Sequence, residues 1–138
     1  MFEKLNTIEL SGKEYPIKCD LCVLEELQEE FGDLEIFESK LLGIRKVKNE
    51  DGSERQERKM PDMKAINTAL YWMVREGMEI QAEKNGDAEA LPSKKEFLRM
   101  VDGPFLELAG TIYKEFLNCF VSKNTETTQR ETEDQENQ

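Results

Sequence analysis

The spacing of apolar and polar residues changes near the start of the chain, within residues 12–32. Up to Lys18, apolar residues alternate with polar ones, which is typical of strands with one buried face. From Asp20, apolar residues recur three or four positions apart, as on one face of a helix, at Leu21, Leu24, Leu27 and Phe31. The pattern therefore predicts a β-hairpin over 6–18 that runs directly into a helix over 20–31.

Residues with strong positional preferences mark the ends of these elements. Ser11-Gly12 supplies the turn of the hairpin. Asp20 is a suitable N-cap for the helix, and Gly32 stands where a left-handed residue would end it. Asp33 can cap a second short helix that stops at Gly43 and carries its apolar residues at Ile36, Phe37, Leu41 and Leu42.

Three more helices are predicted in the second half of the chain. The longest opens at Pro61-Asp62 and runs to about Lys84, with Trp72 beside a main apolar stripe of Ile66, Ala69, Leu70, Met73, Gly77 and Ile80. Ser93 begins a capping box before a short helix, and Pro104 is well placed to start the last one. The last helix should lie in the core through Phe105, Leu108, Ala109, Ile112, Phe116 and Phe120, with Leu106, Tyr113 and Leu117 beside that face.

Two segments are poor in apolar residues. Residues 45–59 contain six basic and four acidic residues around the turn signal Asp51-Gly52, so a solvent-exposed flap or hairpin and a disordered loop are both open. Residues 122–138 contain no apolar residue and predict a disordered acidic tail. The expected fold class is therefore α+β and mostly α-helical. One globular domain over 1–121 would pack an N-terminal β-hairpin on four to five helices.

Composition excludes several classes of function. The chain of 138 residues has a formal charge of −11 and no histidine, which removes the commonest general base and argues against binding of nucleic-acid phosphates. No apolar run approaches the roughly 18 residues of a membrane span, and the N-terminus lacks the pattern of a signal peptide. The three cysteines fit free thiols in a reducing cytoplasm.

Cys19 and Cys22 form a C-x-x-C motif at the start of a helix, where the helix N-terminus can stabilise a thiolate. Acidic residues crowd this site, no βαβ pattern surrounds it, and only Cys119 remains as a further zinc ligand. Packing of one or both cysteines between hairpin and helix is the simpler interpretation. No motif for a phosphate loop, a dinucleotide or a catalytic nucleophile occurs, so we expect no enzyme activity, no cofactor and no metal.

Four glutamates, Glu25, Glu26, Glu29 and Glu30, cover the outer face of the first predicted helix. No Lys or Arg occurs from Asp20 to Glu38 to balance them. Such a charge run is usually a solvated helix face, and the alternative is a docking face for a basic partner. These four glutamates are the candidate partner-binding residues.

The turn sequence Gly12-Lys13-Glu14-Tyr15 and the run 24–32, with the spacing L-x-x-L-x-x-x-F-G, resemble the opening of tail assembly chaperones of long-tailed (siphovirus-type) phages and prophages. Residues 69–77 look like a second landmark of that family, an apolar helix ending in E-G. A final helical pair with a polar end also matches, so the resemblance spans about Leu5 to Phe120. The charged insertion at 45–59 and the N-terminal cysteines depart from the family's pattern.

The resemblance implies a non-enzymatic assembly factor in the cytoplasm of an infected or lysogenic bacterial host, absent from the mature virion. Such a factor binds the tape measure protein, covers its apolar stripes and helps to recruit the major tail (tube) protein. The resemblance implies no cofactor, nucleic acid or membrane partner, and it leaves self-association open.

Two other functions fit parts of the sequence. The charge of −11 and the carboxylate cluster suit an acidic inhibitor or DNA mimic that binds a basic host nucleic-acid enzyme. A redox or metal protein would have to be built on Cys19 and Cys22.

Overall fold

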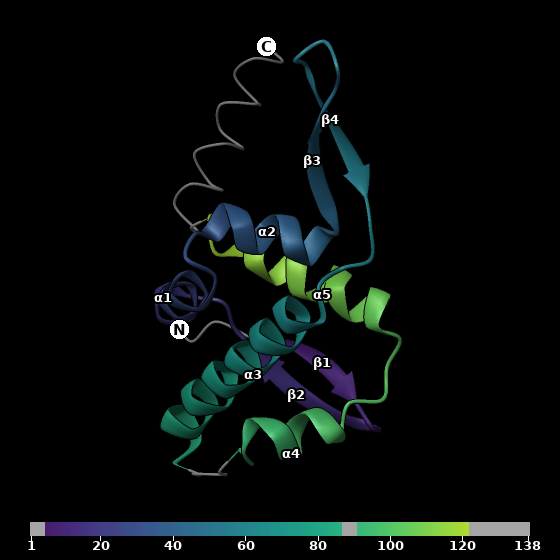
Figure 1. Ribbon diagram of the computed structural model, residues 1–138. Helices are drawn as coiled ribbons and strands as arrows, with labels where there is room; N and C mark the ends of the chain where they lie inside the picture. The colour runs from purple at the N-terminus through teal and green to yellow at the C-terminus, as the bar shows by residue number, and fades with distance from the viewer. Residues whose placement is uncertain (1–4, 87–90, 122–138) are drawn as a thin grey trace, which may run out of the picture.

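The computed structural model describes residues 5–86 and 91–121, and the expected tail at 122–138 lies outside them (Figure 1). The described residues form an N-terminal β-hairpin, a second hairpin and five helices. The expected α+β class, mostly α-helical, is confirmed. No helix within the described ranges has both the length and the apolar character that crossing a membrane requires.

The N-terminal hairpin consists of β1 (Asn6–Leu10) and β2 (Lys13–Ile17), which pair antiparallel as predicted. Ser11 and Gly12 form its turn with φ angles of 52° and 77°, the left-handed backbone that a tight two-residue hairpin turn needs. The alternating apolar residues face the core: Ile8, Leu10, Tyr15 and Ile17 are all buried.

Two helices follow the hairpin, α1 (Leu21–Phe31) and α2 (Leu34–Leu42). Each begins with an aspartate whose side chain accepts a backbone hydrogen bond and ends at a glycine of positive φ, as predicted: Asp20 and Gly32 for α1, Asp33 and Gly43 for α2. The sequence therefore located both ends of both helices.

The second half of the chain forms α3 (Met63–Asn85), α4 (Lys94–Arg99) and α5 (Phe105–Asn118). α3 is the central element, since it contacts β2, α1, α2, α4 and α5. In Figure 1 the N-terminal hairpin lies beside α3 and α4 lies below it, while α2 and α5 lie above it. Asn6 at the start of β1 donates a hydrogen bond to the buried Glu115 of α5 at 2.8 Å, which ties the first strand to the last helix.

The buried apolar residues form a core cluster around α3, whose contribution is Ala65, Ile66, Ala69, Leu70, Met73 and Val74. Three side chains predicted on inner faces are exposed instead: Leu21 by 79%, Ile36 by 47% and Phe120 by 55%. Leu21 is the first residue of α1, and Phe120 follows the end of α5, where its ring touches Phe116 but no further helical turn covers it. Trp72 is half-buried rather than fully enclosed.

β2 lies directly against α3 at Gly77. The backbone N–H of Lys18 donates a hydrogen bond to the carbonyl oxygen of Met73, one turn before this glycine, at 3.0 Å. A Cβ atom on Gly77 would lie 2.4 Å from the carbonyl oxygen of Pro16, closer than real Cβ contacts occur. Gly77 therefore permits the strand to approach the helix this closely.

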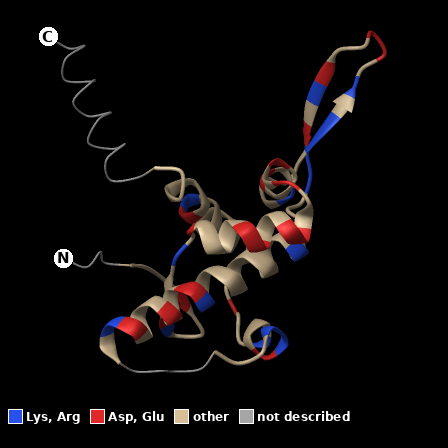
Figure 2. Cartoon of the chain, turned by 90° about the vertical axis from the view of Figure 1, so that its left-hand side faces the viewer, with Lys and Arg blue, Asp and Glu red and all other residues tan. Residues whose placement is uncertain are grey.

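The charged segment at 45–59 forms a hairpin, one of the two possibilities that the sequence left open. Its strands are β3 (Ile44–Lys48) and β4 (Glu54–Arg58), paired antiparallel. We call this hairpin the arm. It rises from the end of α2 and points away from the helices in Figures 1 and 2.

The root of the arm is held by backbone contacts. Gly43 has a φ of 71°, and a Cβ atom there would lie 2.2 Å from the carbonyl oxygen of Lys59. The N–H of Lys59 donates a hydrogen bond to the carbonyl oxygen of Gly43 at 2.7 Å. A glycine at this position thus allows the two ends of the arm to meet.

We predict that Gly77→Ala destabilises the protein by about 2 kcal/mol, because the new methyl group must push β2 away from α3. The loss should appear although alanine favours a helix over glycine by about 1 kcal/mol. Urea unfolding followed by circular dichroism measures the change.

Gly110→Ala is the matched control, because Gly110 is also helical but its Cβ would meet no atom within 4 Å. This change should stabilise the protein by about 0.5–1 kcal/mol. Equal effects at the two glycines would contradict the close approach of β2.

Candidate functional site

The candidate glutamates lie on α1 as predicted. Glu25, Glu29 and Glu30 are exposed, and Glu26 is half-buried. Val23, Leu24 and Leu27 bury the opposite side of the helix, so the carboxylates face solvent. We call these four glutamates the acidic α1 face.

One of these carboxylates has a partner that the local sequence did not reveal. Lys64, in the first turn of α3, lies 2.8 Å from Glu30. The hydrogen bond from Lys64, helped by its charge, lowers the pKa of Glu30. The acidic α1 face is therefore balanced at one end only, and Glu25 and Glu29 form no ion pair with any described residue.

The two cysteines of the C-x-x-C motif have different surroundings. Cys19 is buried in the core, which confirms the packing interpretation for this residue, whereas Cys22 is exposed. Burial and the nearby sulfur of Cys119, to which the Cys19 thiol donates a hydrogen bond, raise the pKa of Cys19. The charges of Asp20 and Glu76 raise the pKa of Cys22. Neither thiol is in a setting that favours the thiolate a redox dithiol needs.

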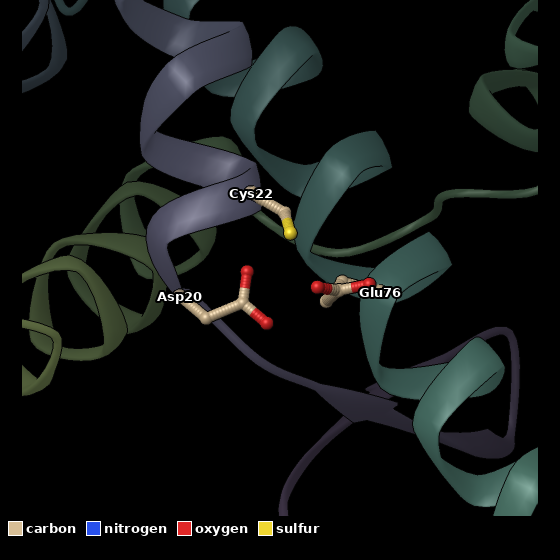
Figure 3. A group of neighbouring side chains, drawn as sticks. All are labelled: Asp20, Cys22 and Glu76. Carbon is tan, nitrogen blue, oxygen red and sulfur yellow. The ribbon is translucent and has the colours of Figure 1, made fainter.

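Asp20, Cys22 and Glu76 converge between the start of α1 and the middle of α3 (Figure 3). Their sulfur and oxygen atoms lie within 4.8 Å of one another, which is the arrangement of a group that could hold a metal ion. A hydrogen bond with Asp20, together with partial burial, raises the pKa of Glu76 from 4.5 to about 7. A proton on Glu76 removes the repulsion between the two neighbouring carboxylates.

A shallow cavity of about 170 Å³ opens beside this cluster and is lined by Cys22, Glu26, Trp72, Arg75 and Glu76, among others. The guanidinium of Arg75 lies 5.1 Å from the centre of the Trp72 ring and 3.3 Å from Glu79. Glu76 lies far along the chain from Asp20 and carries no motif, so the sequence did not reveal it.

The outer side of α5 carries an apolar row that faces solvent. Leu106 and Leu117 are exposed, by 59% and 42%, and Phe120 lies exposed just past the end of the helix. Gly110 is exposed and Tyr113 is half-buried between them. We call these five residues the α5 seam. Their spacing of four, three, four and three positions is that of a heptad repeat, the pattern that pairs one helix with another.

The α5 seam is a candidate surface that the sequence did not reveal. Its spacing was visible in the sequence, but Phe120 was assigned to the core and Leu106 and Leu117 to the margin of the core. The buried face of α5 consists of Leu108, Ala109, Ile112, Glu115 and Phe116. Because the core takes only this narrower face, the seam has no cover among the described elements.

Gly110 lies within the seam where the folded chain does not require a glycine. It does not have the positive φ that favours glycine, and a Cβ would meet open space. A glycine inside a helix costs about 1 kcal/mol relative to alanine. The gap it leaves allows an outside helix to approach α5 closely.

Comparisons with protein-family models, with curated proteins and with solved structures found no match to this chain. The resemblance to tail assembly chaperones therefore depends on the residues that carry it. Gly12 forms the turn of the N-terminal hairpin, the run 24–32 is α1 with its glycine cap, and Gly77 is the point where β2 meets α3. The E-G pair does not end the helix, because α3 continues to Asn85.

We predict that Glu76→Gln makes stability less sensitive to pH. A native pKa of about 7 lies above the ordinary 4.5, so the folded state holds an extra proton between these values and stability falls as pH rises through them. Glutamine cannot lose a proton, so the variant should match the native protein near pH 5 and exceed it at pH 8. Solvent screening at this half-buried group limits the gain to about 1 kcal/mol.

Thermal unfolding from pH 5 to pH 9 tests this, with Glu83→Gln as the control. Glu83 is an exposed carboxylate on the same helix, away from Asp20. If both variants showed the same dependence on pH, the raised pKa of Glu76 would be ruled out.

Proposed function

We propose that this protein is a tail assembly chaperone of a long-tailed phage or prophage, acting without catalysis in the cytoplasm of the bacterial host. Its partners would be the tape measure protein and the major tail (tube) protein, and it would be absent from the mature virion. The α5 seam is the observation that carries the proposal. The resemblance of the hairpin, α1 and α3 to this family supplies the identity of the partner.

The α5 seam suits an amphipathic helix as its ligand. The four seam positions on the helix, from Leu106 to Leu117, extend over about 16 Å, and Phe120 follows just past the helix end. Together they can contact about two heptads of a partner helix. Tape measure proteins are long and helical, and their apolar stripes need cover until the tube protein assembles around them. A seam on one helix can provide that cover through side-by-side helix packing.

The small size of the seam favours reversible binding. A contact along one short helix falls below the area of stable protein–protein interfaces and belongs with transient complexes. A chaperone that must be displaced by tube subunits needs such an interface. The half-buried Tyr113 also stays within reach of solvent, while its hydroxyl donates a hydrogen bond to Glu38 of α2 at 3.4 Å.

An acidic inhibitor of a host nucleic-acid enzyme is the second candidate. It is favoured by the acidic α1 face, where Glu25 and Glu29 lack partners among the described residues. The two functions differ in the forces they use. Binding through the α5 seam should tolerate salt, whereas binding through carboxylates should weaken steeply as salt increases.

We predict that the protein binds a synthetic helical peptide carrying two apolar heptads of a tape measure protein. Replacing Leu106 and Leu117 together with glutamine should weaken this binding at least about tenfold, because the change removes two apolar side chains from the contact. Fluorescence anisotropy of the labelled peptide, repeated from about 0.1 to 1 M salt, measures the affinity.

Lys114→Gln is the control, since Lys114 is exposed on the polar side of the same helix. It should leave the affinity unchanged. Loss of binding in high salt, or equal binding by the Leu106→Gln/Leu117→Gln variant, would count against the chaperone and lead to competition assays with DNA.

We also predict that Gly110→Ala weakens binding of the same peptide about tenfold although it stabilises the free protein. The added methyl group would occupy the space into which the partner helix packs. Measuring the unfolding midpoint and the peptide affinity on one preparation separates the two effects. A variant that is more stable and binds equally well would show that the partner does not approach α5 at Gly110.

A further inference from the structure

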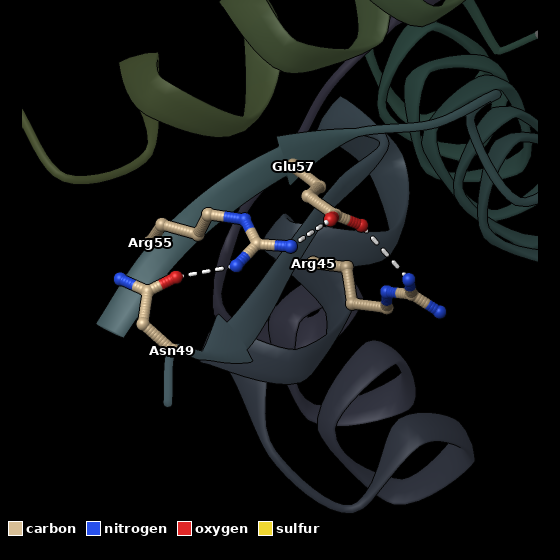
Figure 4. A network of polar contacts seen from close by, with 4 residues as sticks. All are labelled: Arg45, Asn49, Arg55 and Glu57. Carbon is tan, nitrogen blue, oxygen red and sulfur yellow. Dashed lines mark hydrogen bonds and ion pairs between the residues drawn. The ribbon is translucent and has the colours of Figure 1, made fainter. Parts of the chain in front are cut away.

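The arm gives its two faces different charge environments. On one face, Arg45 and Arg55 each lie 2.8 Å from Glu57, and Arg55 also donates a hydrogen bond to Asn49 (Figure 4). The hydrogen bonds from Arg45 and Arg55 lower the pKa of Glu57. Glu57 therefore balances one of the two arginine charges on this face, and both arginines are engaged within the arm.

The other face keeps its positive charge. Residues directly opposite one another share a face of a hairpin, which places Lys46 and Lys48 of β3 together with Arg58 of β4. All three are exposed, and none forms an ion pair with a described residue. Glu54, opposite Lys48, is the acidic residue on this side. We call Lys46, Lys48 and Arg58 the basic arm face.

The arm is a preformed structure that adds nothing to the core. Of its strand residues only Ile44, Val47 and Glu57 are even half-buried. At the tip, Asn49 donates its backbone N–H to the carbonyl oxygen of Ser53 at 2.7 Å, and Asp51 accepts hydrogen bonds from Ser53. An arm that is already folded as a hairpin has less conformational freedom to lose on binding, so its few charges can contribute to affinity.

The chemistry of the arm favours an acidic protein surface over nucleic acid. The segment 45–59 contains no aromatic residue on which a base could stack, and a chain charge of −11 repels phosphates. The acidic α1 face is a carboxylate surface that this chain itself provides. Figures 1 and 2 show the arm directed away from the body, where it can meet such a face on another molecule.

The charges on the basic arm face and on the acidic α1 face are also spaced alike. Lys46 and Lys48 are two residues apart on a strand, which separates them by about 6.6 Å. Glu25 and Glu29 are one turn apart on α1, which separates them by about 6 Å along the helix. Two lysines on the strand can therefore face two glutamates on the helix. Neither of these two glutamates pairs with Lys64, which lies against Glu30.

We propose that the basic arm face binds the acidic α1 face of a second copy of this chain. The two surfaces differ, so each molecule can give its arm to one neighbour and receive an arm from another. Contacts of this head-to-tail kind close into a ring or extend as an open chain. This inference does not depend on the chaperone function, because it uses neither the α5 seam nor its ligand.

Sedimentation velocity of the full chain tests the proposal. At about 0.1 M salt, where charges act over about 10 Å, the protein should associate in a concentration-dependent manner. At about 1 M salt, where this distance falls to about 3 Å, it should be monomeric. A native protein that stays monomeric at 0.1 M salt at every concentration would overturn the proposal.

Charge exchange makes the test specific. K46E/K48E gives a molecule with two acidic surfaces, and E25K/E29K gives one with two basic surfaces. Each variant alone should self-associate at least about tenfold more weakly than the native chain. An equimolar mixture should recover the association, because every arm then meets a surface of opposite charge. Failure of the mixture to recover would overturn the proposal.

The control is K95E/R99E on α4, which changes the net charge as much as K46E/K48E does and uses two exposed residues. It should associate like the native chain, and circular dichroism should show that all variants are folded. If Leu106→Gln with Leu117→Gln abolished association and charge exchange did not, the copies would meet through the α5 seam instead. Binding of a short DNA duplex that K46E/K48E abolishes, without self-association, would assign the arm to nucleic acid.

Discussion

The carbonyl group of Pro16 lies so close to α3 that residue 77 can carry no side chain, and this contact sets the position of the N-terminal hairpin. The hydrogen bond from Lys18 to Met73 holds the same strand one turn away. From there β1 reaches α5 through Asn6 and Glu115, and the first and last elements of the described body become neighbours. This backbone contact therefore helps to bring together Asn6 and Glu115, which lie 109 positions apart in the chain.

This arrangement also decides which surfaces remain for partners. α3 lies at the centre and is covered by hairpin and helices, so the core takes only one face of α5 and one face of α1. The opposite faces carry the α5 seam and the acidic α1 face. Both are formed on regular helices whose inner sides are buried, which gives a partner a surface that needs no rearrangement before it binds.

Much of this fold follows from local signals in the sequence. Alternation predicted the N-terminal hairpin, and Asp20, Gly32, Asp33 and Gly43 marked the ends of two helices. The exposed positions of Leu21 and Phe120 were not predictable from periodicity, because periodicity does not report how much of an apolar face the neighbouring elements cover. The meeting of Asp20 with Glu76, and of Glu30 with Lys64, depends on how α1 packs on α3, so spacing along the chain could not reveal it.

The backbone junction at Gly43 sets where the arm leaves the body, and it is separate from the side chains that the arm carries. Backbone atoms of Gly43 and Lys59 meet where the arm leaves the body, and most side chains along its strands are exposed. Residues along the arm can therefore be exchanged without disturbing the core, as long as the hairpin itself forms. Substitutions there can change the charge that the arm presents, one residue at a time, while the body keeps its stability.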